Sequence, residues 1–384
     1  MDRILGQKCV NLFQKFPAIF LTGPRQSGKT TLAKMMFPDL PYVNFEDAYL
    51  RDAVRSDPHG FLNRYCNGVI IDEVQNIPEI FPLLQIFIDK NEKVGQYLLT
   101  GSQNFLLNEK ISQSLAGRVG VLSLLPLSYS EIQREYPDIS IHRAVFSGGY
   151  PRIYNYQIEN QDFFPSYIQT YVERDVRNLK NVSSLSDFQK LLFLCAGRVG
   201  QILDLSSLCN DTGISIPTMK SWFSLLEASY ILYLMHPYHV NINKRMVKSP
   251  KIYFYDTGLL CSLLGIRNET DLRQHYAYGN IFENFIINEI LKSQLNKGER
   301  SNIYFLRDSQ GHEIDCLIPH SSHRQLCEIK SSATFNTSFV KNLEYFKEDG
   351  DEGMMIYQGN TIFKFKGNAI INCKEFIKMM NEER

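Results

Sequence analysis

The chain has 384 residues, of which 44% are hydrophobic and 21% charged, values typical of a folded globular protein rather than a disordered or fibrous one. Its 41 Lys and Arg residues balance its 41 Asp and Glu residues, so no global basic charge indicates nucleic-acid binding, and any such surface must be local. A chain of this length is expected to form more than one hydrophobic core.

The cysteines and the N-terminus indicate a cellular compartment. Eight cysteines are spread along the chain without a C-x-x-C pair, and several lie in apolar runs, so we expect buried, reduced thiols rather than disulfides or a zinc site. The first 20 residues are interrupted by charges and lack a small-residue cleavage pattern, which argues against a signal peptide. No uncharged apolar run is long enough to span a membrane. We therefore expect a cytoplasmic protein without a membrane partner.

Changes in the apolar pattern divide the chain into four expected domains. Residues 1–135 alternate short apolar runs with helical stretches, which is typical of an α/β domain with a parallel sheet. Residues 136–185 are expected to form a helical lid or connector, 186–255 a helix-turn-helix region, and 256–384 a second, smaller α/β domain. The predicted strands of the first domain are AIFLTG, PYVNF, GVIIDE, QYLLTGS and VGVLSLLPL. Those of the last domain are IYFLRD, EIDCLIP, QLCEIK, GMMIYQG and TIFKF.

A glycine-rich segment lies between the first predicted strand and the helix after it. LTGPRQSGKTT fits the pattern G-x-x-x-x-G-K-[ST], in which backbone N–H groups and a helix N-terminus surround phosphate oxygens. Lys29 is expected to contact the β- and γ-phosphates, and the Thr30 hydroxyl to ligate Mg²⁺. A plain glycine turn is the alternative, which the register of strand, loop, lysine and helix disfavours. The residues expected to bind the nucleotide are Gly23, Pro24, Arg25, Gln26, Ser27, Gly28, Lys29, Thr30 and Thr31.

A second predicted strand, GVIIDE, ends in two carboxylates. A buried central strand has no use for charge unless it ends at a site, so we expect Asp72 to hold Mg²⁺ through water. Glu73 is expected to polarise the water that attacks the γ-phosphate. A helix-capping Asp-Glu pair is the alternative, and it is weak beside the phosphate loop.

The next strand, QYLLTGSQN, ends in polar side chains that would lie beside the γ-phosphate if the strands are neighbours in the sheet. This layout resembles that of AAA+ and related P-loop ATPases, which place a polar sensor after this strand. The resemblance makes Ser102 or Asn104 the sensor, and the sequence does not separate them. Arg118 in SLAGRVG is either a catalytic cation, on this chain's nucleotide or a neighbouring subunit's, or a solvated loop arginine. Action on a neighbouring subunit's nucleotide would require a homo-oligomer.

The middle region has a helix-turn-helix pattern with a second helix at about 216–228, and the apolar strand after it resembles a winged variant. No carboxylate occurs between positions 228 and 255, so a basic wing would suit phosphate contacts with DNA. A role as a protein-packing module, with a protein partner, stays equally open. The basic residues concerned are Lys220 in the second helix and Lys244, Arg245, Lys248 and Lys251 in the wing.

The segment EIDCLIPHSSHRQLCEIKSS predicts a two-stranded hairpin, because two apolar-rich runs flank a polar turn. A turn centred between its adjacent serines places Asp315 opposite Glu328 and Glu313 opposite Lys330, with all four side chains on one face. An Asp opposite a Glu is unfavourable unless a cation or a proton lies between them. Divalent metals such as Mg²⁺ prefer such oxygen ligands.

The same residues resemble the motif of PD-(D/E)XK nuclease-like domains, in which an acid on one strand and an acid-x-lysine on the next hold Mg²⁺ and orient a water. The resemblance implies a site formed by Asp315, Glu328 and Lys330, with Glu283 from the preceding helix. Glu289 on the same helix is the alternative candidate for the position given to Glu283. The sequence departs from the family in having isoleucine before Asp315, where the pattern has proline.

A purely structural interpretation of the hairpin also stays open. Glu313 pairs with Lys330 in that interpretation, and Asp315 bonds a backbone group or Arg307. Whether the domain cleaves any substrate is a separate question from its fold.

Over nearly its whole length the chain resembles prokaryotic AAA+-like ATPases that join an N-terminal P-loop domain to a winged-helix and nuclease-like region. The segments that carry the resemblance are GPRQSGKTT, VIIDEVQ, LLTGSQN, SLAGRVG, GGYPR, YVERD, KIYFYDTGLL and EIDCLIP…CEIK. The resemblance implies an α/β P-loop ATPase that uses ATP and Mg²⁺ and whose nucleotide state controls the C-terminal, DNA-facing module. The alternatives are a nucleotide-switched scaffold for a protein partner and an ATP-gated, Mg²⁺-dependent nuclease.

Overall fold

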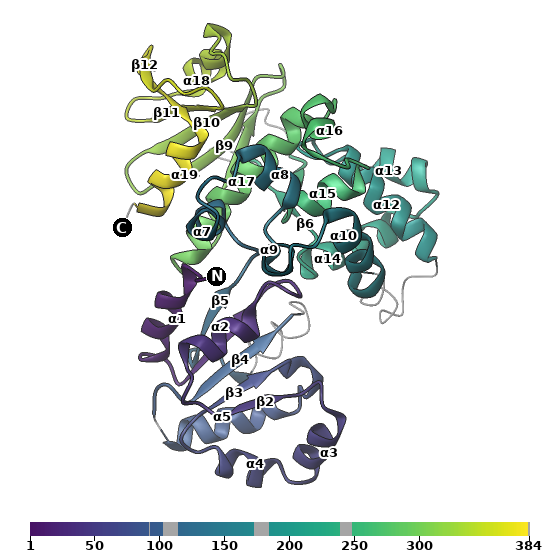
Figure 1. Ribbon diagram of the computed structural model, residues 1–384, viewed down its shortest axis with the longest axis vertical. Coiled ribbons are helices and arrows are strands. Elements are labelled where there is room, and N and C mark those ends of the chain that lie inside the picture. Colours follow the sequence, from purple (N-terminus) through teal and green to yellow (C-terminus); the bar gives the residue numbers. More distant parts are fainter. Residues whose placement is uncertain (92, 103–113, 173–183, 239–247, 383–384) are drawn as a thin grey trace. The chain divides into compact units, whose positions relative to one another are not determined.

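A computed structural model describes residues 1–91, 93–102, 114–172, 184–238 and 248–382 (Figure 1). The chain forms two compact units. Unit 1 contains Met1–Leu127 with the short segments Ala228–Tyr230 and Leu295–Arg300, and unit 2 contains Ser128–Glu227, Ile231–Gln294 and Ser301–Arg384. The expected division into four domains is finer than this one and stays a prediction.

Unit 1 is built around a five-stranded sheet in the order β2-β3-β4-β1-β5, whose neighbouring strands all pair in parallel (Figure 1). All five predicted strands form, and the predicted parallel α/β architecture is confirmed. The elements are α1 (Leu5–Phe13), β1 (Ala18–Thr22), α2 (Lys29–Met36), β2 (Tyr42–Asn44), α3 (Ala48–Ser56), α4 (Pro58–Arg64), β3 (Val69–Asp72), η1 (Val74–Asn76), α5 (Ile80–Asn91), β4 (Tyr97–Gly101) and β5 (Val119–Ser123).

Helices cover both faces of this sheet, which explains why its strands are apolar throughout rather than alternating. One core packs side chains of α3, α4 and α5 against the sheet, among them Val54, Leu62 and Phe81. The other core packs α1 and α2 through residues such as Cys9 and Leu32. The central strands β1, β3 and β4 are buried along their whole length, so a polar side chain at their ends marks a site rather than a solvated surface.

The first part of unit 2 is mostly helical. Helices α13 and α14 are joined by a turn at Gly213, which has φ 75°, and α14 has the bounds that the sequence predicts. Strands β6 and β7 pair antiparallel, and the winged-helix identity stays a prediction. The elements are α7 (Tyr129–Glu135), α8 (Ile141–Ser147), α9 (Pro151–Tyr156), α10 (Asn160–Tyr167), η2 (Ile168–Val172), α12 (Leu185–Gly197), α13 (Leu205–Thr212), α14 (Ile216–Ala228), β6 (Leu232–Met235), β7 (Lys251–Phe254), α15 (Thr257–Leu263) and α16 (Glu269–Gln274).

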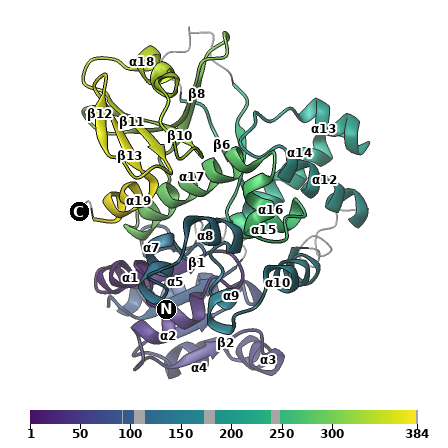
Figure 2. The ribbon, with the colours of Figure 1, turned by 45° about the horizontal axis from the view of Figure 1, so that its top comes forward.

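The rest of unit 2 contains a six-stranded mixed sheet in the order β12-β13-β11-β10-β9-β8 (Figure 2). All five strands predicted for this region form, whereas β13 was not expected. Helix α18 packs against β9 and β10, and α19 packs against β11 and β13. The elements are α17 (Tyr278–Asn296), β8 (Tyr304–Arg307), β9 (Glu313–Pro319), β10 (Arg324–Lys330), η3 (Thr337–Val340), α18 (Lys341–Phe346), β11 (Glu352–Tyr357), β12 (Phe363–Phe365), β13 (Asn368–Asn372) and α19 (Cys373–Glu382).

The hairpin of β9 and β10 has the predicted register. Cys316 pairs with Cys327 and Pro319 with Arg324, so one further step places Asp315 opposite Glu328. Both faces of the hairpin are buried, and Asp315 and Glu328 are only 6% and 3% exposed. The acidic face is therefore part of the interior of unit 2.

Six of the eight cysteines are buried, as expected for structural thiols, and Cys66 is exposed. Burial raises the pKa of Cys9 and of Cys195 to about 12, which keeps these thiols protonated and unreactive. Among the described helices, none has the length and apolar character that crossing a membrane requires.

Candidate functional site

The loop between β1 and α2 needs glycine at two points. Gly23 has φ 145°, and a Cβ there would lie 2.2 Å from the carbonyl oxygen of Leu124. Gly28 has φ 95° and directly precedes α2. Both values lie in the region that L side chains rarely adopt. The two glycines thus allow the tight backbone path that the sequence predicts for a phosphate-binding loop.

The side chain of Lys29 folds back over this loop. It is 5% exposed, and its Nζ donates hydrogen bonds to the carbonyl oxygens of Gly23 at 3.0 Å and Pro24 at 2.7 Å. Burial lowers the pKa of Lys29 to about 8, against the opposing effect of nearby Glu73 and Asp72. The fully buried hydroxyl of Ser27 has no hydrogen-bond partner, so it is a donor that a phosphate oxygen would satisfy. These residues fit a bound polyphosphate.

Asp72 lies at the end of β3, where three hydroxyl groups converge on it. The Thr30 hydroxyl donates to Oδ2 at 2.8 Å, the Tyr42 hydroxyl donates to the same oxygen at 2.7 Å, and the Thr100 hydroxyl donates to Oδ1. Asp72 is 3% exposed. Two expected Mg²⁺ ligands, Thr30 and Asp72, are therefore within hydrogen-bond distance, and their hard oxygens suit that ion.

Glu73 follows Asp72 and has φ 55°, a left-handed conformation that is uncommon for a residue with a side chain. Its carboxylate accepts hydrogen bonds from the Gln75 amide and, at 3.4 Å, from the Ser102 hydroxyl. Burial raises the pKa of Glu73. Strand β4 lies between β1 and β3, so the expected neighbour relation is confirmed and Ser102 lies at the acidic end of the sheet. The rival sensor Asn104 lies outside the described residues.

Arg118 lies at the wrong end of the sheet for its expected role on this chain's nucleotide. In the parallel pairing of β1 and β5, Ala18 is level with Val119, whereas the phosphate loop begins after Thr22. At about 3.3 Å per residue, roughly 15 Å of strand separates the two edges. Arg118 instead binds Asp89, with Nε–Oδ1 at 2.5 Å and Nη2–Oδ2 at 2.9 Å. The prediction of a catalytic cation in cis was wrong, and an action on a neighbouring subunit stays a prediction.

Tyr42 and Gln75 belong to this site and were missed. Tyr42 comes from β2, and nothing in PYVNF distinguishes it from an ordinary strand tyrosine. Gln75 lies two residues after Glu73, and its polar side chain in VIIDEVQ was the available signal.

A second charged cluster lies in unit 2 and contains all four residues of the predicted nuclease-like site. The Lys330 ammonium lies 2.7 Å from Glu328 Oε1 and 3.6 Å from Asp315 Oδ2. The backbone N–H of Ile329 donates to the same Asp315 oxygen at 2.8 Å. Burial raises the pKa of Glu283 to about 7 and of Glu328 to about 8, with the Asp315 charge adding to both shifts.

Lys251, which the sequence placed in a DNA-contacting wing, is a buried member of this cluster. It is 2% exposed, and its Nζ lies 2.5 Å from Glu313 Oε1 and 3.4 Å from Glu283 Oε1. Although burial lowers its pKa, Glu283, Asp315 and Glu313 outweigh that effect and raise it, so Lys251 stays charged. Glu313 also pairs with Arg307 at 2.8 Å, not with Lys330 as the structural interpretation had it.

The cluster does not form a metal cage. Within the described parts of the chain, no group of three or more His, Cys, Asp or Glu side chains is arranged to hold a metal ion. Lysine ammonium groups supply the positive charge between these carboxylates instead. The expected Mg²⁺ arrangement of Glu283, Asp315 and Glu328 is therefore not present.

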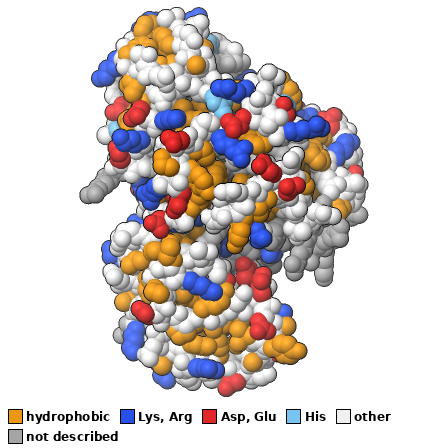
Figure 3. All heavy atoms as spheres, viewed as in Figure 1, with side chains coloured by type: hydrophobic (Ala, Val, Ile, Leu, Met, Phe, Trp, Pro, Cys, Tyr) orange, Lys and Arg blue, Asp and Glu red, His pale blue; other side chains and the backbone are white. Residues whose placement is uncertain are grey.

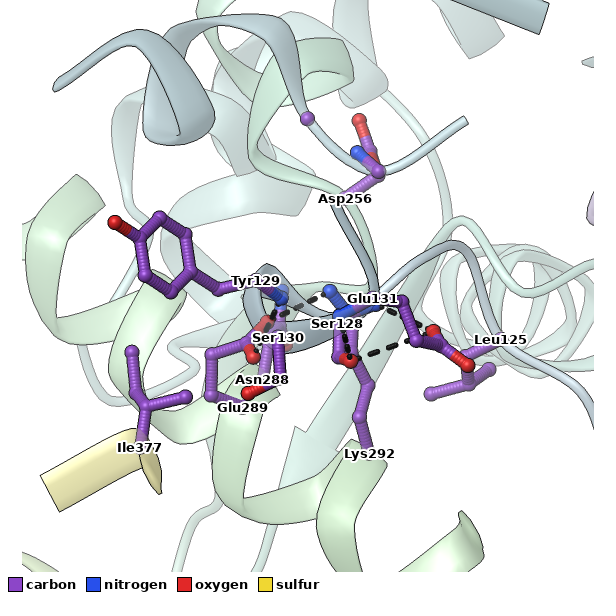
Figure 4. Close-up of polar contacts among 12 residues, drawn as sticks. Leu125, Ser128, Tyr129, Ser130, Glu131, Asp256, Asn288, Glu289, Lys292 and Ile377 are labelled. Atoms are coloured by element: carbon purple, nitrogen blue, oxygen red, sulfur yellow. Dashed lines mark hydrogen bonds and ion pairs between the residues drawn. The ribbon is translucent and has the colours of Figure 1, made fainter. Parts of the chain in front are cut away.

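Glu289, the rival of Glu283, has a separate structural role (Figure 4). Its Oε2 accepts the backbone N–H of Tyr129 at 2.8 Å at the start of α7, and its Oε1 accepts from Lys292 at 3.0 Å. Ser128 and Glu131 form a capping box at the same helix end. Glu289 therefore stabilises the N-terminus of α7, whereas Glu283 lies in the charged cluster with Lys251.

The expected DNA-contacting residues are only partly described. Lys220 is exposed on α14, and the hydroxyls of Ser215 and Thr218 at the start of that helix lie 2.9 Å apart. Lys248 is also exposed, while Lys244 and Arg245 lie outside the described residues. On the face drawn in Figure 3, basic and acidic side chains are interspersed rather than separated into one basic field.

Comparison with protein families assigns three consecutive segments. Residues 15–133 match an AAA domain, 138–270 match the domain of unknown function DUF8612, and 278–376 match the domain of unknown function DUF4143. The first match covers β1 to β5, with the phosphate loop and Asp72. Unit 1 therefore carries an AAA-type ATPase domain.

Related proteins extend over most of the chain. Rv2008c of Mycobacterium tuberculosis and Mb2031c of Mycobacterium bovis are each 31% identical over 322 residues, covering 83% of this chain and 71% of theirs. A Haemophilus influenzae protein is 22% identical over 366 residues, covering 86% of each chain. The Walker-type ATPase PABY2304 of Pyrococcus abyssi aligns with 68% of this chain and 94% of its own at 14% identity, and its TM-score of 0.47 supports no further conclusion. The chain, which carries an AAA domain, belongs to the same family as the two mycobacterial relatives.

Proposed function

We propose that unit 1 binds ATP with Mg²⁺ and hydrolyses it, and that the nucleotide state controls the C-terminal module in unit 2. The observation that carries the proposal is the hydrogen bond from Thr30, at the start of α2, to Asp72, at the end of β3. It joins the phosphate loop to the acidic strand at one edge of a parallel sheet. Loop, hydroxyl and carboxylate are the parts that P-loop ATPases use.

Each residue has a distinct chemical task in this proposal. Lys29 and the backbone of the loop bind the β- and γ-phosphates, and Thr30 and Asp72 would hold Mg²⁺, which neutralises the charge that develops on the phosphate oxygens. Glu73 accepts a hydrogen bond from the attacking water, and Ser102 is the polar sensor. The raised pKa of Glu73 makes its carboxylate a stronger base, which favours transfer of the water proton to it.

Control of unit 2 is the finer part of the proposal. ATP and ADP differ by the γ-phosphate, so contacts of Lys29 and Ser102 to that group bias the protein between two states. DNA is the proposed partner, and the exposed Lys220 of α14 and the exposed Ser215 just before that helix support it. Binding that weakens with salt and is lost in the Lys244→Ala/Arg245→Ala variant would support DNA contact, and salt-insensitive binding would argue against it.

A second candidate is a nucleotide-switched scaffold that binds a protein partner and whose acidic cluster is inert. The position of Lys251 favours it, because its ammonium lies among the carboxylates that an Mg²⁺ ion would otherwise bridge. The gated nuclease is tested by incubating DNA or RNA with Mg²⁺, ATP and either the wild type, Asp315→Ala or Lys330→Ala. Equal background cleavage in all three excludes the nuclease, whereas cleavage by the wild type alone excludes the inert scaffold.

The ATPase is tested by measuring phosphate release from MgATP. We expect hydrolysis by the wild type, none by Lys29→Ala because the γ-phosphate loses its ammonium contact, and ATP binding without turnover by Glu73→Gln. Equal phosphate release by the wild type and both variants would contradict the proposal.

A further inference from the structure

The chain turns sharply after Asp72, and this turn brings Gln75 back to Glu73. Glu73 has φ 55°, and the single 3₁₀ turn of η1 follows, closed by the bond from Asn76 N–H to the Glu73 carbonyl at 3.0 Å. Val74 between them is buried in the core of unit 1. A left-handed residue with a side chain is strained and persists where surrounding contacts fix it. The backbone conformation of Glu73 is therefore fixed by the hydrogen bond from Asn76 and by the buried side chain of Val74.

Three polar side chains form a closed triangle at this turn. The Gln75 amide nitrogen donates to Glu73 Oε2 and lies 3.4 Å from Ser102 Oγ, and Ser102 Oγ lies 3.4 Å from the same Glu73 oxygen. Gln75 thereby joins the expected base on β3 to the expected sensor after β4. The carbonyl oxygen of Gln75, Oε1, is buried without a hydrogen-bond partner.

We propose that Gln75 is a positioning residue for ATP hydrolysis, which orients the Glu73 carboxylate toward the attacking water and couples it to Ser102. The amide N–H bond fixes one carboxylate oxygen, so the other is presented in a constant direction. In the reaction, the water oxygen bonds to the γ-phosphorus, and the bond to the β,γ-bridging oxygen breaks with its electron pair leaving on ADP. The proton released by the water goes to Glu73. This inference rests on the proposed ATPase function.

The test compares Gln75→Met with Gln96→Met in the full chain. Methionine keeps the length of glutamine but removes the amide. Gln96 is a matched control, since it is buried, its Nε2 donates to the Cys66 carbonyl at 3.3 Å, and its Oε1 also has no partner. It precedes β4, at the edge of the sheet away from the phosphate loop.

We expect Gln75→Met to lower kcat roughly 10- to 100-fold with KM for ATP unchanged within about twofold, because misdirection of a catalytic group affects turnover rather than binding. Gln96→Met should leave kcat and KM unchanged. Wild-type kcat in Gln75→Met would overturn the inference. A wild type that neither binds nor hydrolyses ATP would overturn the proposed function instead.

Discussion

The ammonium of Lys29 lies where burial opposes its charge, and this has a measurable consequence. Its pKa is lowered to about 8 in the nucleotide-free protein, and its partners are the two backbone carbonyls of Gly23 and Pro24. A triphosphate places negative charge next to it and must raise that pKa. Binding therefore takes up a proton at any pH above about 8, where the free lysine is partly neutral.

We predict that ATP affinity is constant well below pH 8, begins to fall near that pH and weakens roughly tenfold per pH unit above it. Isothermal titration calorimetry at pH 8.5 in two buffers of different ionisation enthalpy should show proton uptake on binding, and none at pH 6.5. Equal affinity at pH 7 and pH 9.5 would contradict the lowered pKa of Lys29.

Lys251 is the residue on which the charge balance of the acidic cluster depends. Breaking a buried ion pair by removing one partner typically costs about 3–5 kcal/mol, because the remaining charge is left uncompensated. We predict that Lys251→Met lowers the free energy of unfolding of unit 2 by about that amount in urea denaturation, and that Lys251→Met/Glu283→Gln recovers part of it. Lys220→Met, at an exposed position of α14, is the control and should change little. An unaltered urea midpoint for Lys251→Met would exclude this role.

At the scale of elements, the path of the chain from strand β1 through the loop to helix α2 depends on Gly23. Ala at position 23 would meet the Leu124 carbonyl at 2.2 Å in addition to adopting φ 145°. Gly117 is a matched control, since it has φ 76° and a Cβ added there would have no other atom within 4 Å. The conformational cost alone is about 1–3 kcal/mol at either position.

We predict that Gly23→Ala abolishes ATP binding, because the loop must move to relieve the clash, while Gly117→Ala lowers the melting temperature moderately and keeps binding. Fluorescent-nucleotide titration and thermal unfolding of both variants measure this. Retained nucleotide affinity in Gly23→Ala would show that the loop does not bind phosphate in this conformation.

Local pattern was sufficient to predict some elements and not others. Helix α14 and the register of β9 with β10 could be predicted, because a turn residue and a two-residue alternation fix them locally. The error on Arg118 arose because its neighbours in sequence do not reveal at which edge of the sheet the loop lies. Tyr42 and Lys251 reach their clusters from strands distant in sequence, so only the tertiary pairing of β2 and β7 brings them there. The sequence signal for Lys251 was its position at the start of the apolar run KIYF, where a charged residue is unusual.

At the scale of the whole molecule, the part of the chain that the structure describes includes two charged clusters with different chemistry. Unit 1 gathers hydroxyls and a buried lysine around Asp72 and Glu73, next to a loop that fits phosphate. Unit 2 neutralises its carboxylates with its own Lys251 and Lys330. The phosphate loop lies beside the first cluster, so the proposed ATP hydrolysis belongs to unit 1, and unit 2 is proposed as the module that the nucleotide state controls.

The most direct test of this division is calorimetric titration of MgATP into the purified full chain, with Lys29→Ala as the control. We predict saturable binding of one nucleotide per chain in the wild type, dependent on Mg²⁺, and its loss in the variant. Absence of binding of ATP to the wild type at millimolar concentration with Mg²⁺ present would contradict the assignment of unit 1 as a nucleotide-binding domain.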